Sequence, residues 1–247
     1  METTLFGQTR TRIQPRHALI APDGHVPSML PGYSKAVPYY IISRRMGAEM
    51  SQILIKFEQG GRAVLPAEGK EQAFFVEAGT IRVERGSRVK NLGAGGFGFI
   101  PADTVATLKS EEGPARITVF ERDFSPLPGT TPPGALFGNA SEVEPMPFLG
   151  NDGAMLRTLL PADIEWDMAM NIFTYRPGAT LPFVETHVME HGMVMLEGQG
   201  IYRLEEEYYP VTEGDALWMA PYCPQWFVAM GDGPTSYLYY KNCNRSE

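Results

Sequence analysis

The stretch HGMVMLEGQGIYRL, residues 191–204, decides the fold, because its pattern occurs earlier in the chain as QAFFVEAGTIRV, residues 72–83. Gly79 and Gly198 lie at the same distance from the starts of these two stretches. Further along, FIPADTV, ending at Val105, aligns with MAPYCPQ, ending at Gln225. An internal repeat of this kind indicates two copies of one structural unit in one chain.

The repeated unit reads as a β-barrel. The 26 Gly and 21 Pro separate short apolar runs, a pattern typical of strands and turns rather than long helices. Closing each sheet into a jelly-roll barrel removes the exposed edges of many short strands. We therefore predict an all-β fold with two barrels, with strands near residues 39–43, 51–57, 73–77, 80–84, 96–100, 115–120, 168–175, 184–188, 192–196, 200–204, 215–220, 225–229 and 236–240.

A proline-rich segment separates the two halves. Residues 125–147 contain six prolines and little periodicity, which is typical of a connector. We expect an extended N-terminal arm at 1–45, a first barrel at 46–124, a linker at 125–147 and a second barrel at 148–247.

Charge and cysteine content exclude several classes of protein. The 21 basic and 29 acidic residues give a net charge of −8, which makes nucleic acid an improbable partner. The 2 cysteines are too few for a disulfide framework. The start, METTLFGQTRTRIQPRH, lacks the apolar core of a signal peptide, and no later run is long enough to span a bilayer. We expect a cytoplasmic protein with no membrane partner.

Histidine is scarce, yet two of the 4 histidines fall within five positions, at His187 and His191. On a strand, Glu185 and His187 would point to the same face, and a bend could bring His191 beside them. Gln225 could reach the same place from a later strand. Two imidazoles, a carboxylate and an amide oxygen leave room for further ligands, which favours Mn²⁺ or Fe²⁺ over a structural zinc site.

Two other interpretations compete with this metal site. The histidines could be ordinary residues satisfied by hydrogen bonds. The run from His187 to His191 also reads as H-x-x-E-H, a zinc-peptidase signature, but that motif needs a helix, which Pro182 and the β-branched neighbours disfavour.

The first half lacks an equivalent donor set. The positions that align with the four candidate ligands carry Pro66, Glu68, Gln72 and Val105. We expect the N-terminal barrel to hold no metal and to serve packing or subunit contacts.

The last predicted strand offers candidate substrate groups. Tyr237, Tyr239 and Lys241 share one face by the period of two, and we assign that face to the barrel interior. Lys241 could therefore reach the cavity, although a solvated lysine at a strand end is the commoner case. Tyr202 could hydrogen-bond a substrate, although packing is the commoner role of a strand tyrosine.

These residues resemble the two motifs of the cupin superfamily. The resemblance is carried by Gly178, the spacing Glu185-x-His187-x-x-x-His191, Gly198, Gly214, Pro221 and Gln225. The departures are informative: Glu185 stands where common cupins have the first histidine, His191 stands at their glutamate place, and Gln225 replaces their last histidine.

This exchanged set, with FGNASEVE at 137–144 and YKNCNR at 240–245, resembles the (S)-ureidoglycine aminohydrolases. The resemblance implies a bicupin that hydrolyses (S)-ureidoglycine to (S)-ureidoglycolate and ammonia in purine catabolism, with Mn²⁺ in the second barrel. It implies Glu185, His187, His191 and Gln225 as metal ligands, and Tyr202, Tyr237 and Lys241 as substrate groups. Lys241 and Tyr237 become the candidate catalytic residues. It also implies a homo-oligomer.

The same fold leaves other functions open, since one barrel hosts many chemistries. A different metal-dependent cupin enzyme, such as an Fe²⁺ dioxygenase or a sugar isomerase, is the main alternative. A non-catalytic binding bicupin would need neither the metal ligands nor Lys241.

Overall fold

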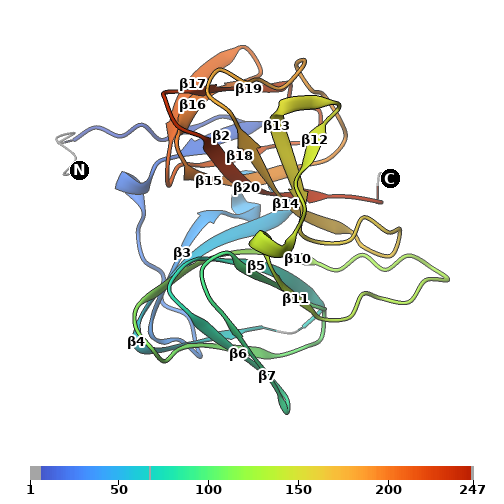
Figure 1. Ribbon diagram of the computed structural model, residues 1–247. Coiled ribbons are helices and arrows are strands. Elements are labelled where there is room, and N and C mark those ends of the chain that lie inside the picture. The colour runs from blue at the N-terminus through green and yellow to red at the C-terminus, as the bar shows by residue number, and fades with distance from the viewer. Residues whose placement is uncertain (1–6, 67, 246–247) are drawn as a thin grey trace.

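The computed structural model describes residues 7–66 and 68–245. In these residues, short apolar runs form strands separated by loops. The strands gather into two lobes, and the first and second halves of the chain each form most of one lobe (Figure 1). The described elements besides strands are three short 3₁₀ helices, η1 (Pro22–Gly24), η2 (Arg44–Met46) and η3 (Ala140–Glu142). The predicted all-β class is confirmed.

One nine-stranded sheet builds the N-terminal barrel. Its strands pair antiparallel in the order β11-β8-β5-β10-β4-β9-β6-β7, with β3 added beside β4. The strands are β3 (Ser34–Ile42), β4 (Met50–Leu65), β5 (Lys70–Ala78), β6 (Ile81–Arg85), β7 (Arg88–Leu92), β8 (Gly96–Ile100), β9 (Ala106–Ser110), β10 (Ala115–Asp123) and β11 (Leu136–Asn139).

Two sheets build the C-terminal barrel, one with the order β1-β2-β18-β15-β20-β14-β13-β12 and one with the order β17-β16-β19. The strands are β1 (Arg12–Ile13), β2 (His17–Ile20), β12 (Met146–Phe148), β13 (Asn151–Thr158), β14 (Met168–Tyr175), β15 (His191–Glu197), β16 (Gln199–Leu204), β17 (Glu207–Thr212), β18 (Ala216–Met219), β19 (Gln225–Met230) and β20 (Thr235–Asn242).

The N-terminal arm and the linker contain more regular structure than the sequence suggests. β2 pairs with β18, so this early segment joins the sheet of the C-terminal barrel (Figure 1). Arg10 reinforces the contact with two hydrogen bonds of 2.7 and 2.6 Å to the buried carboxylate of Asp215. In the linker, β11 pairs with β8 of the N-terminal barrel. Both segments cover sheet edges that would otherwise expose backbone groups. Residues 1–6 and 246–247, at the outer ends of the predicted arm and second barrel, lie outside the described residues.

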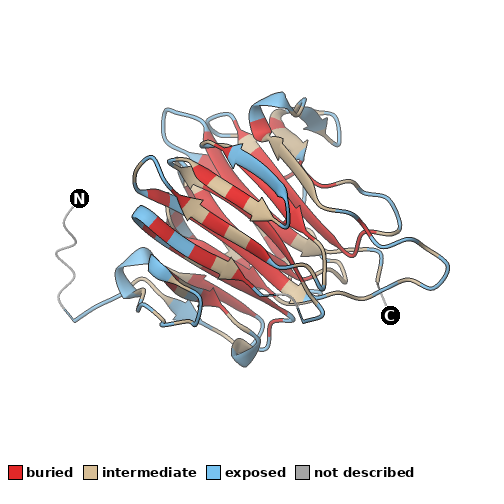
Figure 2. Cartoon of the chain, turned by 90° about the horizontal axis from the view of Figure 1, so that it is seen from below, coloured by how far each residue is buried: buried red, intermediate tan, exposed pale blue. Residues whose placement is uncertain are grey.

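Three apolar layers hold the molecule together. One fills the N-terminal barrel, one fills the C-terminal barrel, and the third lies between the two barrels. Neighbouring side chains of a strand point to opposite faces, so strands at the interface are buried on both sides. On β15, for example, Met193 faces the interior of the C-terminal barrel while Val194 packs in the layer between the barrels. Figure 2 shows the result, with buried positions along the strands and exposed ones mainly in the loops.

The predicted repeat is visible in the backbone of its two glycines. Gly79 has φ of +77° and Gly198 has φ of +76°, a region that side chains disfavour. A Cβ on Gly79 would lie 2.4 Å from the Pro114 carbonyl oxygen, and a Cβ on Gly198 would lie 2.5 Å from that of Pro234. The two barrels therefore make the same tight turn against the same kind of neighbour.

Alanine at either glycine is expected to lower the free energy of unfolding by at least about 2 kcal/mol, because backbone strain and the clash with a carbonyl oxygen add together. Denaturant unfolding would measure this effect. Gly113→Ala is the matched control, since its Cβ would meet nothing within 4 Å. A Gly198→Ala protein as stable as the control would show that the turn relaxes without cost.

Candidate metal centre

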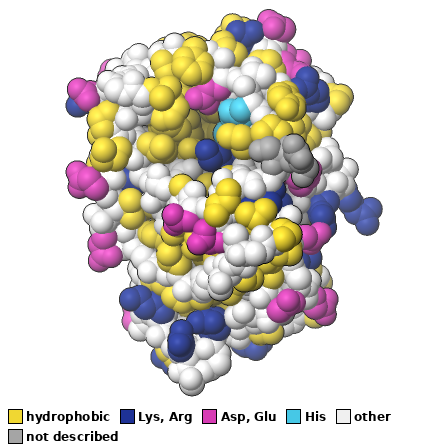
Figure 3. Space-filling view, turned by 90° about the vertical axis from the view of Figure 1, so that its right-hand side faces the viewer, with side chains coloured by type: hydrophobic (Ala, Val, Ile, Leu, Met, Phe, Trp, Pro, Cys, Tyr) yellow, Lys and Arg dark blue, Asp and Glu magenta, His cyan; other side chains and the backbone are white. Residues whose placement is uncertain are grey.

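A cavity of about 410 Å³ lies between the barrels, but the candidate ligands line a smaller one, of about 210 Å³, inside the C-terminal barrel. All seven candidate site residues predicted from the sequence border this smaller cavity. They are Glu185, His187, His191, Tyr202, Gln225, Tyr237 and Lys241. On the surface, histidine atoms lie in a hollow rimmed by hydrophobic side chains (Figure 3).

Glu185 reaches the cavity through a single bridge rather than a strand. Its N–H donates to the Gln225 carbonyl at 2.8 Å, and the Gln225 N–H donates back at 2.9 Å. The predicted strand at 184–188 is wrong. The bridges of Thr180 to Val228 and of Glu185 to Gln225 differ in register by two residues, so no continuous ladder forms along β19.

His187 is held beside Gln225 by the loop that follows this bridge. Its carbonyl accepts a 2.7 Å hydrogen bond from the Tyr222 N–H, which fixes the turn. Its Nε2 lies 3.1 Å from the side-chain nitrogen of Gln225. The Gln225 Oε1 in turn accepts a 3.2 Å hydrogen bond from the Tyr202 hydroxyl. An amide, an imidazole and a phenol thus meet at one wall of the cavity.

His191 opens β15 and lies directly across from Lys241 of β20. Side chains of directly opposed residues lie on the same face of a sheet, so both enter the cavity. The His191 ring stacks on His187, with centroids 4.8 Å apart, and on Tyr239, with centroids 5.4 Å apart. The opposed pair places a basic side chain beside the candidate ligands.

The donor set fits a divalent ion. His191 Nε2 is buried and has no hydrogen-bond partner among the described residues, a state that costs free energy unless a ligand completes it. Within residues 7–66 and 68–245, no three His, Cys, Asp or Glu side chains converge to ion-binding distance as placed. The fit therefore rests on the chemistry of the donors and on the unsatisfied imidazole.

The two imidazoles are held in the neutral form that favours metal binding. Burial holds the pKa of His191 well below its ordinary value, and the positive charges of His187 and Lys241 act in the same direction. Burial and Lys241 also lower the pKa of His187. Neutral imidazole is the form that ligates metals. Burial raises the pKa of Glu185, and the Lys241 ammonium opposes that shift.

The tyrosines of the cavity act as neutral hydrogen-bonding groups. Burial raises the pKa of Tyr202 and Tyr237 well above the ordinary value, so both keep their protons. The Tyr237 hydroxyl lies 2.9 Å from that of Tyr175. This pair can offer a proton to a ligand without carrying charge.

Comparison with known proteins identifies the family. Residues 171–240 match the cupin domain family. A probable (S)-ureidoglycine aminohydrolase of rice (Oryza sativa subsp. japonica) is 36% identical over 98% of this chain and 77% of its own length. The chain belongs to the (S)-ureidoglycine aminohydrolase family. The Escherichia coli member is 33% identical over 92% of this chain and 88% of its own length.

A solved structure supports the same assignment. The crystal structure of protein Ylba from Escherichia coli superposes with a TM-score of 0.86 at 30% identity, covering 96% of this chain and 95% of that one. The predicted cupin fold and aminohydrolase family are confirmed. As a member of this enzyme family, the chain is a cupin that acts on a small molecule. Its described residues include no helix with the length and apolar character needed to cross a bilayer.

One residue supports the candidate site from behind, as its strand parity, opposite to that of His191, allows. Glu190, next to His191, is fully buried and accepts hydrogen bonds from Trp218 Nε1 at 2.7 Å and from the Glu49 N–H at 2.9 Å. Glu49 belongs to the first half of the chain, so this carboxylate ties the start of β15 to the N-terminal barrel. The sequence alone shows that Glu190 and His191 point to opposite faces, but it does not show that Glu190 contacts Glu49 across the interface.

Proposed function

We propose that the protein hydrolyses (S)-ureidoglycine to (S)-ureidoglycolate and ammonia. The observation that carries the proposal is that Lys241 and all four candidate metal ligands line one cavity small enough for this substrate. In the reaction, the bond between the α-carbon and the amine breaks, and a water oxygen bonds to that carbon. The amine leaves as ammonia after gaining a proton.

The proposed ligands of the metal are Glu185, His187, His191 and Gln225, and the proposed metal is Mn²⁺. An oxygen- and nitrogen-rich set with open positions suits this ion. When bound, it would supply a positive charge that orients and polarises the substrate. Tyr202 supports the Gln225 side chain through its hydroxyl and, in the proposal, also contacts the ureido group of the substrate.

Lys241 has two proposed tasks. Its ammonium pairs with the substrate carboxylate and so fixes which face of the α-carbon meets water. It also exchanges a proton with the departing amine. Tyr237, neutral and paired with Tyr175, donates a hydrogen bond to the same substrate. A fixed face at the α-carbon explains why a single enantiomer of product would form.

We further propose a cytoplasmic homo-oligomer. Both cysteines, Cys223 and Cys243, are free, which suits a reducing compartment. Phe183 and Val184 are exposed just before the first candidate ligand, where a second copy of the chain could cover them.

The decisive experiment generates (S)-ureidoglycine in place with an allantoate amidohydrolase and follows the chirality of ureidoglycolate, because this substrate also decays spontaneously. The Mn²⁺-loaded protein is expected to yield the (S) product alone. Racemic product at the spontaneous rate would refute the proposal. Oxygen consumption without ammonia release would point instead to a cupin dioxygenase.

A further inference from the structure

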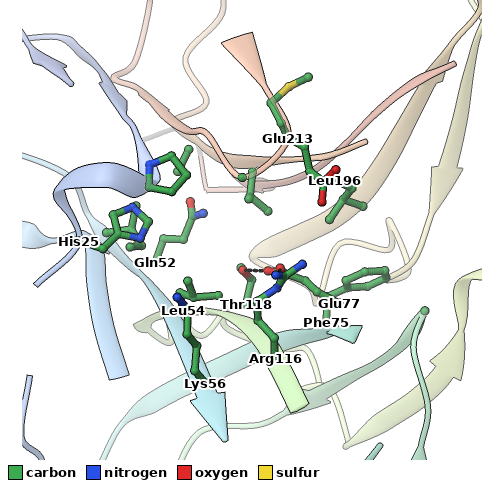
Figure 4. A pocket seen from close by; sticks show the side chains of 17 residues that line it. His25, Gln52, Leu54, Lys56, Phe75, Glu77, Arg116, Thr118, Leu196 and Glu213 are labelled. Carbon is green, nitrogen blue, oxygen red and sulfur yellow. Dashed lines mark hydrogen bonds and ion pairs between the residues drawn. The ribbon is translucent and has the colours of Figure 1, made fainter. Parts of the chain in front are cut away.

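The larger cavity, of about 410 Å³, lies between the two barrels and shares no lining residue with the metal cavity. Its walls come from β4, β5 and β10 of the N-terminal barrel and from β15 and β18 of the C-terminal one. Figure 4 shows Gln52, Lys56 and Arg116 on the N-terminal side of this space and Leu196 and Glu213 on the opposite side. Polar and apolar side chains therefore line the cavity from both barrels.

Gln52 supplies a buried, unsatisfied acceptor at this cavity. Its side chain is 1% exposed, and its Nε2 donates to the Met193 carbonyl at 3.2 Å. Its Oε1 has no hydrogen-bond partner among the described residues. A buried acceptor left unpaired costs free energy, so an N–H or O–H donor at this place would be stabilising.

His25 offers a second acceptor near Gln52 (Figure 4). Its Nε2 is likewise buried without a partner within residues 7–66 and 68–245. Burial lowers the pKa of His25, and the nearby Lys56 lowers it further, so the ring is neutral near pH 7. A neutral ring has one nitrogen that accepts a hydrogen bond.

The lining of the cavity carries two cations, Lys56 and Arg116, and two carboxylates, Glu77 and Glu213. Arg116 and Glu77 neutralise each other through a 2.6 Å contact, and Thr118 donates to the same carboxylate at 2.5 Å. Lys56 lies over the ring of Tyr39, 5.0 Å from its centroid, and the described residues place no carboxylate within ion-pair distance of it. Its ammonium is thus available to an anion.

These polar groups are specific to this side of the molecule. Lys56 lies opposite Arg116 in the N-terminal barrel, and the equivalent pair of the C-terminal barrel is Thr174 opposite Ser236. When β4 is aligned with β14 in this way, the position of Gln52 is occupied by Met170 in the C-terminal barrel. The fold alone therefore does not require an amide and an ammonium here.

We propose that the cavity between the barrels is a second small-molecule site, selective for a small carboxylate that also carries N–H donors. The carboxylate pairs with Lys56, the N–H groups donate to Gln52 Oε1 and His25 Nε2, and the apolar wall formed by Leu54, Phe75 and Val194 packs on the carbon skeleton. The proposal does not depend on which reaction the metal cavity performs.

Calorimetric titration of the full-length Lys241→Met protein with N-carbamoylglycine, a carboxylate with a ureido group, tests this site, because that background lacks the ammonium proposed to hold a carboxylate in the metal cavity. Lys56→Met and Gln52→Met are each expected to weaken binding by at least about tenfold. Acetate, which lacks N–H donors, and N-methylurea, which lacks the carboxylate, are expected to bind at least about tenfold more weakly than the probe.

Two controls separate this site from the rest of the molecule. His191→Ala changes the metal cavity, and Lys90→Met changes an exposed lysine of the β6–β7 hairpin. Both, added to the Lys241→Met background, are expected to keep its affinity. Any other pattern overturns the proposal. Undetectable binding of the probe would do so, and so would binding that is lost only in the His191→Ala protein. If Gln52→Met fails to fold, Lys56→Met, at an exposed position, decides alone.

Discussion

Replacement of His191 by alanine is expected to abolish bound metal and to lower the rate of ureidoglycine hydrolysis by at least about a hundredfold. Loss of an outer contact to a ligand already costs about 10- to 100-fold in metal affinity or activity, so loss of a ligand should cost more. His191 is a strong candidate because its Nε2 is buried, neutral and without a partner among the described residues. Elemental analysis of the purified variant and the chirality of the product measure the two effects.

His25→Ala is the matched control for this substitution. His25 is also partly buried, but it borders the cavity between the barrels and not the metal cavity. The His25→Ala protein should therefore keep its metal content and its stereospecific hydrolysis. A chelator should reproduce the His191→Ala defect in the unchanged protein, and added Mn²⁺ should reverse it. Full metal content in the His191→Ala protein would remove His191 from the ligand set.

The repeat in the sequence predicted the most reliable part of the fold. Gly79 and Gly198 align at equal spacing, and both take the same left-handed conformation against a proline carbonyl. Backbone geometry of this kind leaves a direct trace in sequence, because only glycine satisfies it without strain. The alternation of Met193 and Val194 between two apolar layers is the period of the strand predicted at 192–196.

Features that depend on distant pairing were beyond local sequence signals. β2 is only four residues long and gains its order from β18, which lies almost two hundred positions later. In the same way, Glu185 reaches Gln225 through one backbone bridge instead of a strand. Strand parity predicted that Glu185 and His187 share one cavity, and both do line it. A loop, and not the predicted strand, places them there.

The cavity between the barrels had no sequence signal at all. Gln52 and Lys56 lie four positions apart on one face of β4, with the apolar Leu54 between them, so no run of polar residues marks the site. That this face of β4 meets β15 of the other barrel is a property of how the two repeats pack. Unsatisfied acceptors such as Gln52 Oε1 become visible only once both barrels are in place.

Substitution of Lys241 by methionine is expected to lower kcat/KM by at least about a hundredfold while leaving the metal bound. A charge-assisted contact to a carboxylate is worth roughly twice a neutral hydrogen bond, and the same group is proposed to move a proton, so both losses add in the transition state. Methionine keeps the length and apolar stem of lysine, which preserves packing beside Tyr239 on β20.

The division between KM and kcat shows which task of Lys241 dominates. An anchor for the carboxylate mainly raises KM, and Lys241→Arg should then recover part of the affinity, because arginine also pairs with carboxylates. A proton carrier mainly lowers kcat, and arginine should not replace it. Lys90→Met, on the exposed hairpin, should leave both constants unchanged. Unchanged kcat/KM in the Lys241→Met protein would mean that the ammonium, although it lies across from His191, takes no part in the reaction.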